Sequence, residues 1–150
     1  MMKNVYRVLA FLVAAGVMVQ AAAIAYGMFG LIKWVENGGT LDKATELNSE
    51  LGGYTGFSLH GIAGTMIIPI IVLLFLISSF FAKIPGGVKW ALFVFLAALV
   101  QVALGLFAHA IAGLGWLHGL NALILFGLAV TAGMRVNRVA AVETRDPVAV

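Results

Sequence analysis

The sequence contains no cysteine and very few charged residues. Without cysteine, the chain cannot form a disulfide, a thiolate metal site or a cysteine nucleophile. Only 10% of its 150 residues are Asp, Glu, Lys or Arg, whereas a soluble domain carries roughly 25%. The stretch 90–134 contains no charged residue at all. A water-soluble core has no use for so long an uncharged stretch, so we expect a membrane protein.

Apolar residues fill the sequence instead: 63% are hydrophobic, and the mean hydropathy is +1.09. One membrane crossing takes about 20 apolar residues. The apolar stretches predict four spans, at about residues 8–32, 54–82, 90–112 and 116–134. A Gly-Leu-Gly turn at 113–115 divides the last two. Because the connections after the second and third spans are short, consecutive helices should be antiparallel neighbours. We therefore expect an all-α, up-down four-helix bundle that forms one domain.

Two further segments complete this expectation. An outer loop should cover residues 33–53, with a short helix over Leu41–Leu51 that begins near an N-cap at Thr40. The tail, residues 139–150, should be frayed. The first apolar run resembles a secretory signal, but it continues to Ile32 and exceeds the roughly 7–15 residues of a signal core. We expect it to be retained as a helix.

The basic residues predict the orientation of the spans. Seven of them fall on one side: Lys3, Arg7, Lys83, Lys89, Arg135, Arg138 and Arg145. The other side has only Lys33 and Lys43, accompanied by four acids. Since basic residues gather on the cytoplasmic side, both termini should lie inside the cell. We expect a multi-pass protein of a prokaryotic plasma membrane, and the net charge of +3 gives no reason to expect nucleic-acid binding.

The few polar residues within the spans include all three histidines. The set is Gln20, His60, Thr65, Gln101, His109, His118 and Asn121. Ionisable groups inside a membrane are costly and are candidates for function. His60, His109 and His118 should lie at similar depth near the outer face. His60 and His118 come from the second and fourth spans, which are diagonal partners in such a bundle and face each other across its core.

Two neutral imidazoles on opposite sides of a flat macrocycle are the ligands of a bis-histidine haem. We therefore expect haem b, with His60 and His118 bound to the iron. Gly64 would give the ring room, Asn121 could bond a ring edge, and His109 would support the site or act as an alternative ligand. Other interpretations stay open: the histidines could bond neighbouring helices, or all three could converge on zinc or copper. Gln20 and Gln101 should serve packing.

The segments Leu59-His60-Gly61 and Leu117-His118-Gly119-Leu120-Asn121-Ala122 resemble one four-helix half of the haem A synthase family. The resemblance implies that His60 and His118 ligate haem. In that family a glutamate just before the first histidine is functional, and many members have a cysteine pair in the loop. This chain has Gly56, Phe57, Ser58 and Leu59 before His60, and Glu50 is its closest acid. The resemblance therefore implies a haem-binding relative without the family's oxidation of a haem methyl group.

We expect a haem protein that acts in electron transfer or haem handling for a respiratory complex, with a quinone as a further partner, and that is not an enzyme in its own right. One alternative is a cofactor-free accessory subunit of a membrane complex or a small transport module. Another is a compact haem A synthase-like oxidase, in which two copies would pair as a homodimer.

Overall fold

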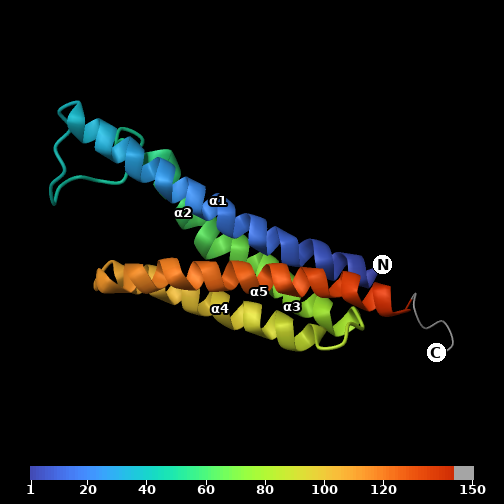
Figure 1. The fold of residues 1–150 in the computed structure, drawn as a ribbon. Helices are drawn as coiled ribbons and strands as arrows, with labels where there is room; N and C mark the ends of the chain where they lie inside the picture. Colours follow the sequence, from blue (N-terminus) through green and yellow to red (C-terminus); the bar gives the residue numbers. More distant parts are fainter. Residues whose placement is uncertain (144–150) are drawn as a thin grey trace. The chain divides into compact units, whose positions relative to one another are not determined.

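The structure, a computed structural model, describes the main chain of residues 1–143 and the side chains of residues 1–136. This part of the chain is all-α, as the sequence predicts (Figure 1). Its elements are α1 (Met2–Glu36), α2 (Tyr54–Ile62), the π-helix η1 (Ala63–Ile67), α3 (Ile68–Phe81), α4 (Gly87–Ala108) and α5 (Gly113–Glu143). Four continuous stretches are long and apolar enough to cross a membrane: α1, α2 through α3, α4, and α5 as far as Val136. Four long apolar helical stretches, the number that the sequence predicts, are thereby confirmed.

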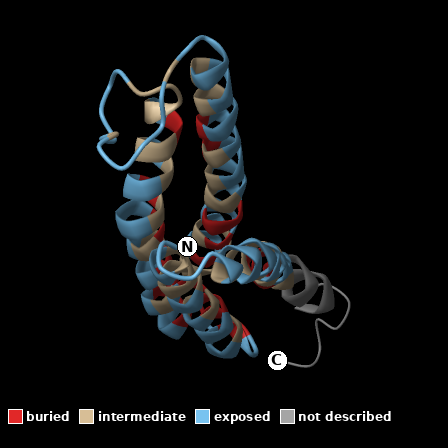
Figure 2. Ribbon diagram, turned by 90° about the vertical axis from the view of Figure 1, so that its left-hand side faces the viewer, coloured by how far each residue is buried: buried red, intermediate tan, exposed pale blue. Residues whose placement is uncertain are grey.

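Many large apolar side chains are exposed on the surface of the isolated chain. Phe29 is 73% exposed, Leu123 68% and Phe80 63%. Exposed residues, pale blue in Figure 2, run along the helices, and buried residues appear as short red segments between them. So much exposed apolar surface is typical of a protein that contacts a membrane. The structure therefore describes a multi-pass membrane protein.

The chain divides into two compact units, unit 1 (Met1–Val17 and Ile68–Val150) and unit 2 (Met18–Ile67). That the two units form one domain, as the sequence predicts, stays a prediction. In unit 1, the first part of α1 packs with α3, α4 and α5 as a bundle, and α4 contacts both α3 and α5. The core residues of α5 recur at helical spacing: Leu125, Ala129, Ala132 and Val136. Such spacing gives each helix one apolar stripe that faces its neighbours.

Tyr6 joins the beginning of α1 to the core of unit 1. Its side chain is 0% exposed, and its ring centroid lies 4.7 Å from that of Phe75. Its hydroxyl donates a hydrogen bond to the main-chain oxygen of Gly87 at 3.1 Å. Because a buried phenol needs a partner for its O–H group, this bond holds α1 against the beginning of α4.

Glycine pairs bring α1 and α2 together in unit 2. A Cβ atom at Gly30 would lie 2.7 Å from Cα of Gly53, and one at Gly56 would lie 2.7 Å from Cα of Gly27. Gly53 caps α2 with φ of 83°, a conformation that favours glycine. Gly27 and Gly30 thus allow the two helices to approach closely.

The second span contains a π-helical turn that the sequence analysis did not predict. η1 lies between α2 and α3 and ends at Ile67, two residues before Pro69. Proline has no N–H group, and its ring collides with the carbonyl four residues earlier, that of Thr65. The helix accommodates Pro69 by widening over one turn. The presence of Pro69 within the apolar run could have indicated an irregular turn in this helix.

The predicted helix over Leu41–Leu51 is wrong, since the loop there is irregular. The Asp42 carboxylate accepts a hydrogen bond from the Ala44 N–H at 2.9 Å, and the Asn48 side-chain oxygen accepts one from the Glu50 N–H at 3.0 Å. Asp and Asn side chains that bond nearby N–H groups compete with the helical hydrogen bonds, and here they prevail.

The connection between the third and fourth spans also differs from the prediction. α4 ends at Ala108 and α5 begins at Gly113, so the turn covers 109–112 rather than 113–115. In this turn the N–H of Ile111 bonds the carbonyl of Phe107 at 3.0 Å, and the N–H of Leu114 bonds the carbonyl of Ile111 at 2.9 Å. α5 continues to Glu143, beyond the predicted start of the tail. The rest of the predicted tail, residues 144–150, lies outside the described residues.

We predict that Gly56→Ala destabilises the packing of α1 on α2. The new Cβ atom would overlap main-chain atoms of Ala23 and Gly27, and overpacking costs about 1–3 kcal/mol. Thermal unfolding in detergent measures this loss. Gly61→Ala is the matched control, because no atom lies within 4 Å of its added Cβ. Equal stability of the two variants would contradict the glycine-packing interpretation.

Candidate functional site

His60 lies on α2 and bonds the main chain of α1 within unit 2. Its Nδ1 is 3.1 Å from the main-chain oxygen of Gln20. A carbonyl oxygen only accepts, so Nδ1 carries a proton, and in the neutral ring Nε2 is then the unprotonated nitrogen. Histidines that ligate metals usually donate their other ring N–H to a carbonyl or carboxylate in this way. The local geometry of His60 thus fits a ligand.

The side chain of Gln20 lies beside Gly64, one helical turn after His60. Its Oε1 is 3.0 Å from the place that a Cβ atom would take at Gly64, so the missing side chain of Gly64 makes room for the amide. Nε2 of Gln20 is buried and has no hydrogen-bond partner among the described residues. A buried amide without an acceptor is unfavourable by about 1–3 kcal/mol. This donor is therefore suited to an acceptor from outside the chain.

His118 lies on α5 and bonds α4 within unit 1. Its Nδ1 is 3.0 Å from the main-chain oxygen of Gln101, and its Nε2 is 3.0 Å from the Nε2 of the same glutamine. Since Nδ1 donates to the carbonyl, Nε2 must accept from the amide N–H. A Cβ atom at Gly105 would lie 3.0 Å from Cε1 of His118. Gly105 thus makes room for the imidazole against α4.

Asn121 completes a network of hydrogen bonds around Gln101. Its Nδ2 donates to the side-chain Oε1 of Gln101 at 2.7 Å and to the main-chain oxygen of Ala97 at 2.9 Å. Every hydrogen bond of this network joins α5 to α4. Gln101 therefore both holds the two helices together and covers the ring nitrogen of His118 that would bind a metal.

The described residues do not place His109 within a span and do not form a three-histidine metal site. His109 is the exposed C-cap residue of α4 rather than a residue within a span. Among the described residues, no group of three His, Cys, Asp or Glu side chains could hold a metal ion. Because His60 belongs to unit 2 and His118 to unit 1, their ligation of one iron stays a prediction. The roles of Gly64 and Asn121 toward a cofactor stay predictions too.

The two histidines share a local arrangement that the sequence analysis missed. Leu59-His60-Gly61 and Leu117-His118-Gly119 are the same tripeptide. In each, the histidine Nδ1 bonds the main-chain oxygen of a glutamine on the preceding helix. The repeated Leu-His-Gly tripeptide, together with one glutamine in each preceding span, was the available signal.

Comparison with known proteins finds no relative of this chain. No protein-family model, curated protein or solved structure matches the chain.

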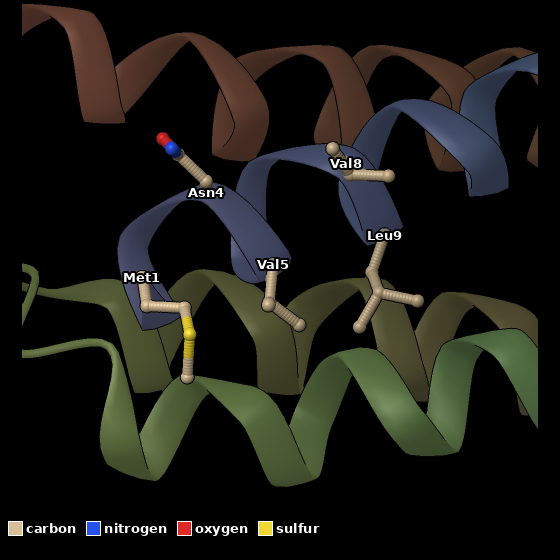
Figure 3. A pocket seen from close by; sticks show the side chains of 5 residues that line it. All are labelled: Met1, Asn4, Val5, Val8 and Leu9. Carbon is tan, nitrogen blue, oxygen red and sulfur yellow. The ribbon is translucent and has the colours of Figure 1, made fainter.

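A hollow on the first turns of α1 is the other feature of interest. It is lined by Met1, Asn4, Val5, Val8 and Leu9, whose side chains are drawn in Figure 3. Its lining is almost wholly apolar and offers no imidazole, thiolate or carboxylate. The hollow therefore offers no ligand for a metal.

We predict that Asn121→Leu weakens the attachment of α5 to α4, because Gln101 loses the donor to its side-chain oxygen. A net hydrogen bond is worth about 0.5–1.5 kcal/mol, and bonds between membrane helices average roughly 0.6 kcal/mol. Unfolding in mixed micelles should show a loss of this size. Thr131→Val, at an exposed position of the same helix, is the control, and an equally small effect of both would contradict the network.

Proposed function

We propose that this protein is a membrane haem protein in which His60 and His118 ligate a b-type haem. One observation carries the proposal: each histidine donates its Nδ1–H to a main-chain oxygen. This bond fixes the ring orientation, and in the neutral ring it makes Nε2 the unprotonated nitrogen, which a metal requires. Two neutral imidazoles are the donor set of bis-histidine haem.

The residues present fit this group in a second respect. The unpartnered Nε2 of Gln20, beside the turn that follows His60, supplies a donor for a polar group of the cofactor. When bound, haem would supply a one-electron carrier within the membrane. The chain's own part would be to orient two imidazoles and to exclude water from the ring. Electron transfer, or haem handling for a respiratory complex, is the task we propose.

The orientation of the spans belongs to the same proposal. Seven basic residues against two support a cytoplasmic location for both termini. His60 and His118 would then lie toward the outer face of the membrane. The resemblance of the two Leu-His-Gly segments to haem A synthase supports haem binding. We do not extend the proposal to oxidation of haem, because no glutamate directly precedes His60.

A second candidate function has its own supporting observation. Both ring nitrogens of His118 bond Gln101, which is how a histidine that only holds two helices together would be arranged. In this case the protein would be a cofactor-free accessory subunit. The two candidates differ in colour, so one absorption spectrum of the purified protein separates them.

We predict that the detergent-purified protein, expressed with added haem, shows a Soret band and narrow α and β bands after reduction with dithionite. His60→Ala and His118→Ala should each abolish retention of the haem. His109→Ala is the matched control, since this exposed histidine lies outside the helices. Unchanged haem content in both of the first two variants would refute the assignment, and a colourless wild type would favour the accessory subunit.

We also predict that Gln101→Leu raises the affinity for haem. The substitution removes the amide that competes for Nε2 of His118 and keeps the main-chain oxygen that binds Nδ1. A competing hydrogen bond of about 0.5–1.5 kcal/mol corresponds to a roughly 2- to 10-fold tighter Kd. Haem titration followed at the Soret band measures it. Thr131→Val, at an exposed position of α5, is the control, and a weaker Kd for Gln101→Leu would show that Gln101 assists binding instead.

A further inference from the structure

Basic residues gather around the connection between α3 and α4 in unit 1. Lys83 lies within this connection and Lys89 in the first turn of α4, and both are exposed. Arg135 of α5 bonds the main chain of the connection. The described side chains of unit 1 include no Asp or Glu. The positive charge of this cluster, which we call the basic cluster (Lys83, Lys89 and Arg135), is therefore not neutralised by any described side chain of its own unit.

The contacts of Arg135 are with neutral groups. Its Nη2 donates to the main-chain oxygen of Pro85 at 3.1 Å, and its guanidinium carbon lies 5.5 Å from the ring centroid of Trp90. Its Nε is buried without a partner among the described residues. Gly86, with φ of 71°, leaves room for Nη2 because a Cβ atom there would lie 3.2 Å away. A carbonyl and a ring orient a guanidinium but do not neutralise it.

Lys89 is arranged in the same way. Its ammonium lies 5.6 Å from the ring centroid of Phe93, and the rings of Phe93 and Trp90 meet edge to face at 6.0 Å. Two cations thus rest on two adjoining aromatic rings. Aromatic rings beside Lys and Arg are typical of the level of the lipid headgroups. Just before the connection, Phe80 and Phe81 are 63% and 62% exposed, so apolar surface adjoins the charges.

We propose that the basic cluster binds the phosphate of an anionic phospholipid headgroup. The guanidinium of Arg135 keeps its positive charge while Nη2 bonds Pro85, and the ammonium groups of Lys83 and Lys89 add two point charges that attract a phosphate. Inorganic phosphate would meet the same charges, but the exposed phenylalanines favour a ligand with acyl chains. Basic residues that adjoin membrane helices attract anionic lipids in this manner. The proposal is independent of haem and of the side of the membrane on which the cluster lies.

The test is thermal unfolding of the full chain in neutral detergent with added phosphatidylglycerol, phosphatidylcholine or inorganic phosphate. Phosphatidylglycerol should raise the Tm of the wild type, whereas the other two should leave it unchanged. Arg135→Gln and Lys89→Gln should each lose at least half of this increase. Lys43→Gln, at an exposed position of the loop in unit 2, is the matched control and should keep the full increase.

Arg135 also bonds Pro85, so its replacement can lower the Tm without lipid; Lys89 makes no such hydrogen bond among the described residues. The Tm with lipid is therefore compared with the Tm without lipid for each variant separately. Circular dichroism checks that each variant keeps its helical content. An equal increase in Lys89→Gln and wild type would overturn the proposal. An equal increase with phosphatidylcholine would do the same, and an increase with inorganic phosphate alone would exclude a lipid as the specific ligand.

Discussion

The structure depends on one constraint of the bilayer: a polar group in the hydrocarbon must find its partner inside the protein. The spans carry few polar side chains. The hydroxyls of Thr65, Ser78 and Ser79 bond carbonyls three or four residues earlier in their own stretch, whereas the histidine and asparagine bonds cross from one helix to another. His60 bonds α1, while His118 and Asn121 bond α4. In an α-helix the main-chain N–H and C=O groups already bond each other. The polar side chains therefore determine which helices lie together. The candidate site and the packing of the helices therefore rest on the same hydrogen bonds.

The sequence predicts the spans well, because their length and hydropathy are properties of long segments. It predicts the ends of the elements less well, because those depend on a few local contacts. The irregular loop around Asp42 and the turn at 109–112 are set by individual hydrogen bonds. η1 follows from the single residue Pro69. The glycine contacts of Gly27 and Gly30 were predictable, since little else in an apolar helix explains glycine.

The candidate site was predictable in its residue types but not in its partners. Histidine within a span is unusual, so His60 and His118 stand out from the sequence alone. The choice of acceptor depends on the rotation of each helix about its axis, which the uniformly apolar spans do not encode clearly. Gln20 and Gln101 were therefore interpreted as packing residues, although each supplies the main-chain oxygen that orients a histidine. Ligation of one haem iron by both histidines would also depend on how unit 1 and unit 2 are placed relative to each other.

The two glutamines differ in a way that bears on the choice between a haem protein and an accessory subunit. The amide of Gln101 donates to His118 and accepts from Asn121, so its polar atoms are satisfied within unit 1. The Nε2 of Gln20 is buried and lacks an acceptor among the described residues. A protein whose histidines served only to join helices would gain about 1–3 kcal/mol by satisfying that donor or replacing it with an apolar group. The unsatisfied donor next to His60 is what a site for an external acceptor would contain, and for this reason we favour the haem protein.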